Sequence, residues 1–575
     1  MRLHIIRTSL ALAMACGLAE AQYPPLGVPV PFVPVYPPIV SPAANPQTPA
    51  KVNLGKILFW DEQVSADDSV ACGTCHAPEA GGADPRVLEP EARHPGFDGV
   101  FGTADDRSGS PGVIQAMLQG THVDDGTFYP SVQVTPRRAP GVYDLGSSIR
   151  MFWDGRLNET FLSPETGTVV SLAGAALENL ALVPMLNDRE MSCLQRGLGH
   201  LVTKLQYAKP LKLASDLPPS FAAILAANPS YGDLFHAAFG TSQITGERIS
   251  KAIAAYLRTL RSDQTPFDAF VAAGGVNNSP FGGLTMPPVL TGLTPNQFNG
   301  LQVFVQRCLV CHTAPIFGSS NLANPGLNDP FEDPGRASIT NSPVDFGRLK
   351  IPGLRNVGLR EAFGLTRSGN YESLEEVVDS YMQGGTFPWN TSPQVLAAAS
   401  PVLSATGKAD LVDFLRNGLT DPRVAQALPP FDHPTLASQR SVLPQSYGTG
   451  HPGAAGVEPQ LVAKQPPVVG SFGFTLGISG GQGGSAAVLA LSTAPAPPGL
   501  HFGQVPLHIS PLVQPLLVTI GLQGQGAGNG MGSISFPIPD QQVLEGMTFY
   551  GQWFVVDPAA QGGLSATQGF SFTML

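Results

Sequence analysis

The order of apolar and polar positions predicts helices in the first three quarters of the chain. One helix face is indicated by apolar residues at helical spacing, Ile249, Ile253, Tyr256, Leu257 and Leu260. Thr245 is suited to cap that helix. At Thr294, a following Pro and a Gln at the third helical position make a capping box before another apolar face. Further helices are predicted near 373–383 and 407–417.

Beyond about residue 466 the pattern changes to short β-rich runs separated by Gly- and Pro-rich turns. The runs are 472–476, 487–491, 516–520, 533–536, 547–556 and 570–573. This part of the chain has only three charged residues, Asp540, Glu545 and Asp557. Several short strands with turn signals between them predict an all-β sandwich.

These changes of pattern predict a multidomain protein. The predicted segments are a Pro-rich lead-in (22–50), an N-terminal helical domain (51–275), a C-terminal helical domain (289–431), a linker (432–465) and the β-sandwich (466–575). A Gly- and Pro-rich break at 273–288 separates the two helical domains.

Residues 1–21 have the pattern of a secretory signal peptide. Arg2 and Arg7 precede an apolar run at 9–19, and Ala19-Glu-Ala21 offers a small-residue cleavage site. We therefore expect a periplasmic or secreted protein. We expect no membrane span, because no later apolar stretch is long enough.

Composition narrows the classes of partner. Of the 575 residues, 43% are hydrophobic and 13% are charged, and the formal net charge is −11. Hydrophobic residues suffice for packed cores. The negative charge argues against nucleic acid and anionic lipid as partners.

The cysteines point to covalent haem. Two C-x-x-C-H motifs are present, Cys72-Gly-Thr-Cys75-His76 and Cys308-Leu-Val-Cys311-His312. In this motif the thiols bond to the haem and the adjacent His ligates the iron. A zinc site or a redox pair is the alternative, but neither needs a His at the fifth place twice. The sequence therefore predicts two haem c groups, and Cys193 is left as a spare thiol.

Several further motifs occur in a characteristic order. They are Leu54–Phe59, Phe152-Trp-Asp-Gly-Arg156, Glu190-Met191, Ala252–Ala254, Arg258–Leu260, Lys350–Asn356 and Leu374–Val378. With the haem motifs, this set resembles the bacterial di-haem cytochrome c peroxidases and their MauG-like relatives over about 50–430. The resemblance implies two mainly α-helical cytochrome-c-type domains, with a peroxidatic haem in the first and an electron-transfer haem in the second.

The resemblance also implies roles for single residues. His76 and His312 would ligate the irons, Trp153 would relay electrons between the haems, and Glu190 would act in the distal pocket of the first haem. A carboxylate over the iron can take a proton from peroxide and return it to the leaving oxygen. The alternatives are core packing for Trp153 and a helix-start carboxylate for Glu190.

The chain departs from the family pattern in two places. The family usually has Gln ten residues before the distal Glu, where this chain has Leu180. The stretch Glu361–Gly369 is two residues longer than its family counterpart and has no Met or Tyr for the second haem. Tyr371 and Met382 are nearby, but each is expected to be structural. The sixth ligand of the second haem therefore stays open.

Two minor hypotheses concern the segment after the first motif. Asp98, Asp105 and Asp106 lie in one Gly-rich turn and are candidate Ca²⁺ ligands, with a solvated surface turn as the alternative. The family also carries Ca²⁺ near the place of 350–352. His94 or His122 is a candidate for capping the first iron in the resting state.

The leading hypothesis is an exported di-haem c oxidoreductase of the peroxidase type. It would reduce hydrogen peroxide with electrons from a donor protein, a small cytochrome c or a cupredoxin, and it would form a homodimer as the family often does. One alternative is MauG-like or oxygenase-like oxidation of a protein or organic substrate. Another is a bis-ligated electron-transfer cytochrome without catalysis. The β-domain would be a binding or packing module.

Overall fold

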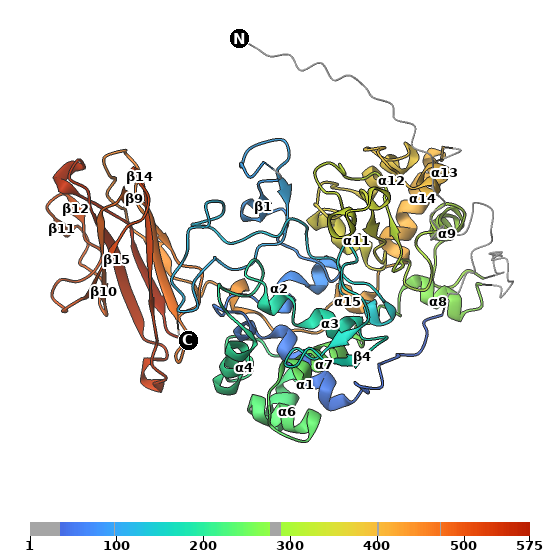
Figure 1. Cartoon of the computed structure of the whole chain (residues 1–575), viewed down its shortest axis with the longest axis horizontal. Helices are drawn as coiled ribbons and strands as arrows, with labels where there is room; N and C mark the ends of the chain where they lie inside the picture. Colours follow the sequence, from blue (N-terminus) through green and yellow to red (C-terminus); the bar gives the residue numbers. More distant parts are fainter. Residues whose placement is uncertain (1–34, 97, 277–288, 400–401, 472) are drawn as a thin grey trace, which may run out of the picture.

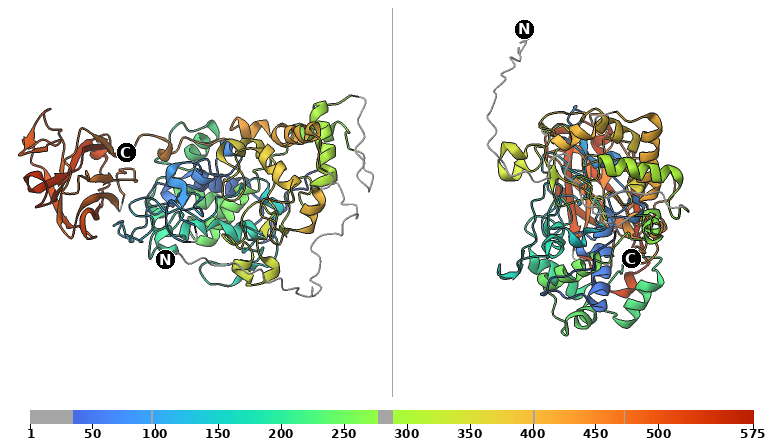
Figure 2. Two further views of the ribbon diagram at one scale, coloured as in Figure 1. Left: turned by 90° about the horizontal axis from the view of Figure 1, so that it is seen from above. Right: turned by 90° about the vertical axis from the view of Figure 1, so that its right-hand side faces the viewer.

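The computed structural model describes residues 35–96, 98–276, 289–399, 402–471 and 473–575. The predicted signal peptide, 1–21, and the first part of the Pro-rich lead-in, 22–34, lie outside these ranges. In the views of Figures 1 and 2 the β-rich region stands at one end of the molecule. The first group of helices lies in the middle and the second group at the opposite end. Among the described residues, no helix is both long and apolar enough to cross a membrane.

The first helical group surrounds the first haem motif. Its helices are α1 (Pro49–Trp60), α2 (Cys72–Cys75), α3 (Ala176–Ala181), α4 (Leu198–Tyr207), α5 (Pro219–Ala227), α6 (Tyr231–Phe239), α7 (Gly246–Leu257) and, from later in the chain, α15 (Pro422–Ala425). The predicted amphipathic helix is confirmed as α7, and the Thr245 hydroxyl accepts a hydrogen bond from Arg248 N at 3.2 Å. Its apolar face packs on α1, where the backbones approach closely at Gly55.

The second helical group surrounds the second motif. Its helices are α8 (Pro266–Ala272), α9 (Pro295–Arg307), α10 (Ala337–Thr340), α11 (Val357–Arg360), α12 (Leu374–Met382), α13 (Pro393–Ala398) and α14 (Ala405–Asp413). The predicted capping box at Thr294 and Gln297 is confirmed, with reciprocal hydrogen bonds of 3.2 and 3.1 Å. Because α9 ends at Arg307, Cys308 follows directly at its C-terminus.

Short strand pairs brace the loops of both groups. They are β1 (Arg93–His94) with β2 (Arg107–Ser108), β3 (Phe161–Leu162) with β4 (Val169–Ser171), and β5 (Leu322–Ala323) with β6 (Leu349–Lys350). The β5–β6 pair places Lys350, at the start of the 350–356 motif, beside the loop that follows the second haem motif.

The C-terminal region is all-β, as predicted. Its strands are β7 (Gln445–Tyr447), β8 (Gln460–Val462), β9 (Phe474–Gly483), β10 (Ala486–Ser492), β11 (His501–Phe502), β12 (Val505–Pro506), β13 (Leu516–Gly521), β14 (Gly526–Phe536), β15 (Thr548–Val556), β16 (Leu564–Ala566) and β17 (Gly569–Thr573). One sheet has the order β13-β10-β15-β17-β7 with β16 on β15, and another has the order β14-β9-β8. Both sheets contribute to one apolar cluster that includes Leu476, Leu489 and Trp553.

The predicted linker needs a correction. Residues 432–465 contain β7 and β8, which pair with β17 and β9 respectively. A two- or three-residue strand in a polar context has too little periodic pattern to be recognised in the sequence. The β region therefore begins inside the segment predicted to be a linker.

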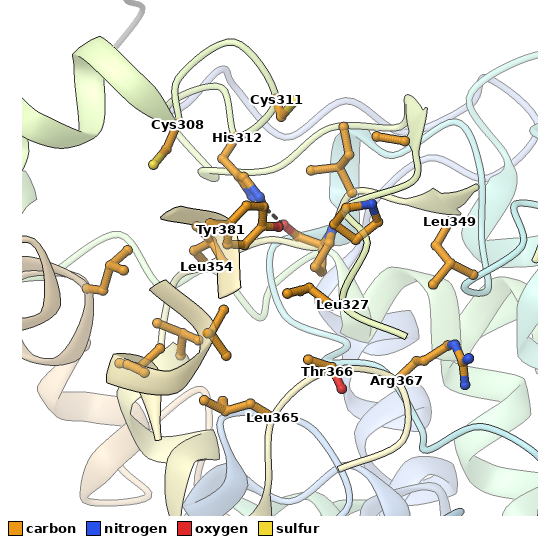
Figure 3. Close-up of a pocket in the computed structure, with 18 of the residues that line it drawn as sticks. Cys308, Cys311, His312, Leu327, Leu349, Leu354, Leu365, Thr366, Arg367 and Tyr381 are labelled. Carbon is orange, nitrogen blue, oxygen red and sulfur yellow. Dashed lines mark hydrogen bonds between the residues drawn. The ribbon is translucent and has the colours of Figure 1, made fainter. Parts of the chain in front are cut away.

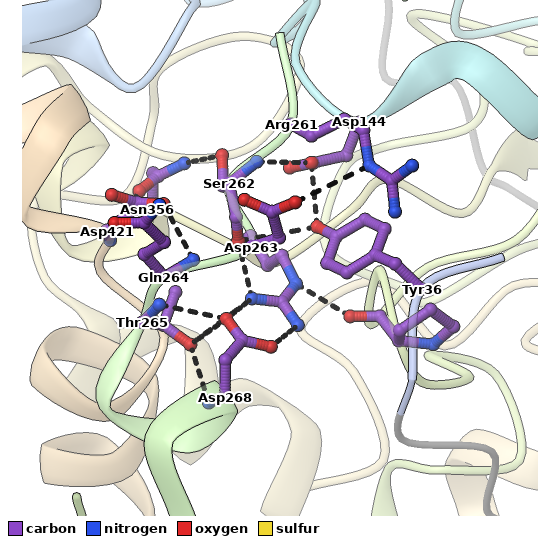
Figure 4. A network of polar contacts seen from close by, with 12 residues as sticks. Tyr36, Asp144, Arg261, Ser262, Asp263, Gln264, Thr265, Asp268, Asn356 and Asp421 are labelled. Carbon is purple, nitrogen blue, oxygen red and sulfur yellow. Dashed lines mark hydrogen bonds and ion pairs between the residues drawn. The ribbon is translucent and has the colours of Figure 1, made fainter. Parts of the chain in front are cut away.

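A buried polar network joins the lead-in to both helical groups (Figure 4). The Tyr36 hydroxyl donates to Asp144 at 2.7 Å. Arg355, from the 350–356 motif, forms two hydrogen bonds of 2.7 and 2.8 Å with the Asp268 carboxylate. Its neighbour Asn356 donates to the Ser262 hydroxyl at 2.7 Å. The motif thus holds the segment between α7 and α8, which leads from the first group to the second.

Candidate active site

The first haem motif forms the short helix α2 and the turn after it. His76 Nδ1 lies 3.1 Å from the Gly82 carbonyl and donates a hydrogen bond to it. The other ring nitrogen, Nε2, is therefore left as the metal-ligand atom. Burial lowers the pKa of His76, so the imidazole is neutral. Trp60 packs on Gly73 so closely that a Cβ there would lie 2.2 Å from the indole. The core thereby fixes the motif.

The second motif follows α9 and borders a cavity of about 210 Å³ (Figure 3). His312 Nδ1 lies 3.0 Å from the Phe317 carbonyl and 3.2 Å from the Pro352 carbonyl. Burial lowers the pKa of His312 to about 4, so this imidazole is also neutral. Its Nε2 is again the ring nitrogen left for a metal.

The residues at both motifs fit covalently bound haem. All four motif cysteines are free and half-buried, and none is in a disulfide. Burial raises the pKa of the Cys72 and Cys308 thiols to about 12 in each case. Two thiols and one neutral imidazole in each motif are the donor set that haem c requires.

Trp153 is held by two hydrogen bonds. Its indole Nε1 donates to the Arg138 carbonyl at 2.8 Å, and its own carbonyl accepts from Lys350 N at 2.6 Å. The side chain lines the cavity beside His312. Ala83, which follows the Gly82 carbonyl that binds His76, lines the same cavity. The indole therefore shares this cavity with His312 of the second motif and with a chain neighbour of the carbonyl that binds His76.

Glu190 lies near the first motif. Burial raises the pKa of the Cys72 and Cys75 thiols, and the negative charge of Glu190 adds to this effect. Its own pKa is raised by burial, against the opposing effect of Arg156. Asn187 Nδ2 donates to Glu190 Oε1 at 2.9 Å and orients the carboxyl group. A carboxyl group with a raised pKa is suited to accept and return a proton near neutral pH.

Comparison with known proteins identifies the family. Residues 49–275 match the family model described as di-haem cytochrome c peroxidase. The match covers the first helical group apart from α15. The resemblance seen in the sequence is thereby confirmed, and the protein is an oxidoreductase enzyme of the peroxidase type.

The individual relatives share between a fifth and about a quarter of their aligned residues with this chain. The chain is 26% identical over 387 residues to the methylamine utilization protein MauG of Methylorubrum extorquens, covering 66% of this chain and 81% of the relative. It is 27% identical over 326 residues to the cytochrome c peroxidase Ccp of Escherichia coli (strain K12), covering 55% and 50%. A solved MauG-like protein associated with microbial copper homeostasis shares 21% identity, with coverage of 72% and 98% and a TM-score of 0.45.

The wall of the second cavity contains a residue that the sequence analysis missed. Tyr371 is not among the residues that line this cavity. Its hydroxyl instead contacts the Thr386 hydroxyl at 2.9 Å. Met382 and Tyr381 do line the cavity. Tyr381 lies near His312 in the cavity (Figure 3). Burial raises the pKa of its phenol, and the Cys311 and Cys308 thiols add to this effect. The position of Tyr381 at the end of α12 is visible only once the helix is placed against α9.

Leu180, which stands where the family usually has Gln, is a packing residue. Leu180 is half-buried at the end of α3 and packs against the core of the first helical group. An apolar side chain there donates no hydrogen bond to a ligand of the first haem.

The histidines that follow the first motif are both neutral. Burial lowers the pKa of His94 and of His122 to about 4. The His94 ring packs on Phe128, and the His122 ring packs on Tyr129. Whether either caps the first iron stays a prediction.

The candidate calcium ligands share one loop. Asp98 Oδ1 accepts from Val100 N at 2.8 Å, and Asp106 Oδ2 accepts from Gly102 N at 2.7 Å. Asp105 Oδ1 accepts from the Thr103 hydroxyl at 2.7 Å. Within the described ranges, no group of three or more His, Cys, Asp or Glu side chains is arranged to hold a metal ion. Calcium at this loop stays a prediction.

Proposed function

We propose that the protein reduces hydrogen peroxide at a haem held by the first motif, with electrons supplied by a donor protein through the second. The observation that carries this proposal is an asymmetry between the two sites. An acid–base carboxyl group, Glu190, lies beside the first motif, whereas a phenol, Tyr381, lies beside the second. The first site is thereby suited to proton transfer and the second to iron ligation.

The chain's own residues move the proton. Haem iron, when bound, would supply the peroxide-binding and electron-accepting centre. Glu190 would take the proton from the oxygen that binds and deliver it to the oxygen that leaves. Asn187 keeps the carboxyl group oriented through its 2.9 Å hydrogen bond. Trp153 would pass single electrons between the two motifs.

The negative net charge of the protein bears on the kind of electron donor that it would bind. The formal net charge of −11 favours a basic donor, a small cytochrome c or a cupredoxin, because opposite charges steer association. The signal peptide supports action in the periplasm or outside the cell. Homodimer formation and calcium binding belong to this proposal only through the family resemblance.

A second candidate function is MauG-like oxidation of a protein or organic substrate. Two observations favour it. Leu180 stands where the family usually has Gln, and Tyr381 lines the second cavity together with Met382. A phenolate ligand would lower the reduction potential of the second haem and weaken it as an electron store.

The decisive test is peroxide turnover with two reductants. Full-length holoprotein should oxidise a reduced small cytochrome c in the presence of hydrogen peroxide, with one peroxide consumed per two electrons. Peroxide-dependent oxidation of a quinol or protein substrate, without oxidation of the cytochrome, would support the MauG-like function instead. Two low-spin haems that bind neither cyanide nor peroxide would exclude both enzymatic functions and support an electron-transfer cytochrome.

Replacing Tyr381 by Phe is expected to change the second haem alone. The phenol lines the cavity beside His312, and its removal takes away the candidate sixth ligand. Electron paramagnetic resonance of the ferric variant should show one additional high-spin haem. Met382→Leu is the matched control and should leave the spectrum unchanged. An unchanged Tyr381→Phe spectrum would contradict ligation by Tyr381.

A further inference from the structure

The sheet β14-β9-β8 has two different faces. In β9, Phe474, Leu476 and Ile478 point into the apolar cluster shared with the other sheet. Side chains alternate along a strand, so Thr475 points the opposite way, with Ser535 as its partner on β14. At Thr475 on β9 and Ser535 on β14 this second face is polar, yet Thr475 is fully buried.

The polar face is covered by residues 112–133, the segment that we call the bracing segment. The Thr475 hydroxyl donates to the Gly120 carbonyl at 2.8 Å, and His122 N donates to the Ser533 hydroxyl at 2.8 Å. Gly120 has φ +91°, and a Cβ there would lie 2.6 Å from Ser535 Oγ. Only glycine fits this position without strain.

An apolar contact strengthens the same interface. Ile114 and Val132 of the bracing segment form a buried cluster with Val462 of β8, and Tyr129 packs at its edge. All three strands of the sheet therefore contact the segment. These strands carry no charged side chain, so the interface is held by apolar packing and neutral hydrogen bonds rather than ion pairs.

The other side of the bracing segment rests on the backbone of Glu190. At Gly112, a Cβ would lie 2.2 Å from the Arg189 carbonyl oxygen and 2.6 Å from that of Glu190. Leu194 N donates to the Ala116 carbonyl at 2.9 Å. The segment is thus enclosed between the C-terminal sheet and the part of the chain that presents the distal carboxyl group.

We propose that the C-terminal sheet positions Glu190 through the bracing segment. The β region is then a part of the enzyme that sets the geometry of the first site, rather than an independent docking module. Thr475 and Ser533 act as positioning residues, since neither is placed at the haem motifs. This inference rests on the proposed role of Glu190 in proton transfer.

The physical reason is the sensitivity of proton transfer to geometry. The carboxyl group must lie within hydrogen-bond reach of the oxygen that binds, and a displacement of about 1 Å can lower a rate by about 100-fold. A loop with few buried contacts would allow such displacements. The sheet supplies both the buried apolar contact and the two hydrogen bonds that restrain it.

The test removes the two hydroxyl groups without changing side-chain size. In the full-length holoprotein, Thr475→Val combined with Ser533→Ala should raise amide hydrogen exchange in residues 112–133 and 187–194. The rate constant for peroxide reaction should fall about tenfold, with haem content and the KM for the donor unchanged. Cyanide association at the first haem should slow similarly, because HCN must also give up a proton. The single variant Thr475→Ser keeps the hydroxyl group, so both rates should equal those of the wild type.

The matched control is Thr573→Val, which removes the 2.9 Å hydroxyl contact with Thr548 on the exposed side of the other sheet. It should change neither exchange in the bracing segment nor the two rates. Faster exchange with unchanged peroxide and cyanide rates in the double variant would overturn the proposal. Unchanged exchange would overturn it as well. If the wild type fails to turn over peroxide, the proposed function fails, while cyanide association still tests the positioning.

Discussion

Replacing Glu190 by Gln is expected to lower the rate of peroxide reduction by about 100- to 10,000-fold. Glutamine keeps the size of the side chain and its hydrogen-bonding ability toward Asn187, but it cannot accept the proton of peroxide. Haem content and both His ligations should be unchanged, because Glu190 takes no part in them. Stopped-flow measurement of the peroxide reaction, with optical spectra of the resting protein, separates the two effects.

The pH dependence gives a second readout for the same variant. Burial raises the pKa of Glu190, and the carboxylate form is the one that accepts a proton. The wild-type rate should therefore rise with pH through a pKa above the ordinary carboxyl value and then level off. The Glu190→Gln rate should lack this limb. Asn187→Ala, which removes the 2.9 Å hydrogen bond, should keep the limb at a lower rate. A Gln variant with wild-type turnover would exclude the proton-transfer role.

Replacing Arg355 by Ala is expected to cost about 3–5 kcal/mol in free energy of unfolding. The Arg355 side chain is 1% exposed and forms two hydrogen bonds with Asp268, at 2.7 and 2.8 Å. It also donates to the Pro315 carbonyl at 2.7 Å and lies 4.7 Å from the centre of the Tyr36 ring. Its removal leaves a largely buried carboxylate without a counterion.

Urea denaturation, followed by haem absorbance, measures the decrease in the free energy of unfolding. Arg355→Lys should be intermediate, since an ammonium keeps the charge but cannot make the paired hydrogen bonds. Lys408→Ala is the control, because Lys408 pairs with Asp379 at the surface, where such pairs contribute at most about 1 kcal/mol. An Arg355→Ala variant as stable as the Lys408→Ala control would show that the network in Figure 4 does not hold the two helical groups together.

Several features were predicted because their chemistry is local in the chain. The C-x-x-C-H motifs need adjacent residues, since two thiols and an imidazole must reach one haem. The capping box at Thr294 and the amphipathic face of α7 also depend on residues close together in the chain, and the structure confirms them. The alternation in β9 and β14 indicated strands but could not indicate what covers their polar face.

Other features depend on contacts between distant residues. The linker prediction was wrong where β7 and β8 join the sheets, because their short patterns gain meaning only from their partners. Tyr381 was passed over in favour of Tyr371 and Met382, because the direction of a phenol depends on how α12 packs. The Thr475 hydroxyl meets Gly120 across 355 residues of sequence.

The sequence by itself predicted the haem attachment motifs, the family resemblance, and the division into helical and β-rich parts. These follow from covalent motifs and from hydrophobic periods, which need no knowledge of distant contacts. Only the tertiary structure decided which residues surround each motif, where Arg355 is buried, and that the C-terminal sheet contacts the segment behind Glu190. The reason is physical: burial, pKa and hydrogen-bond partners are properties of the packed chain, and packing brings together residues that are far apart in sequence.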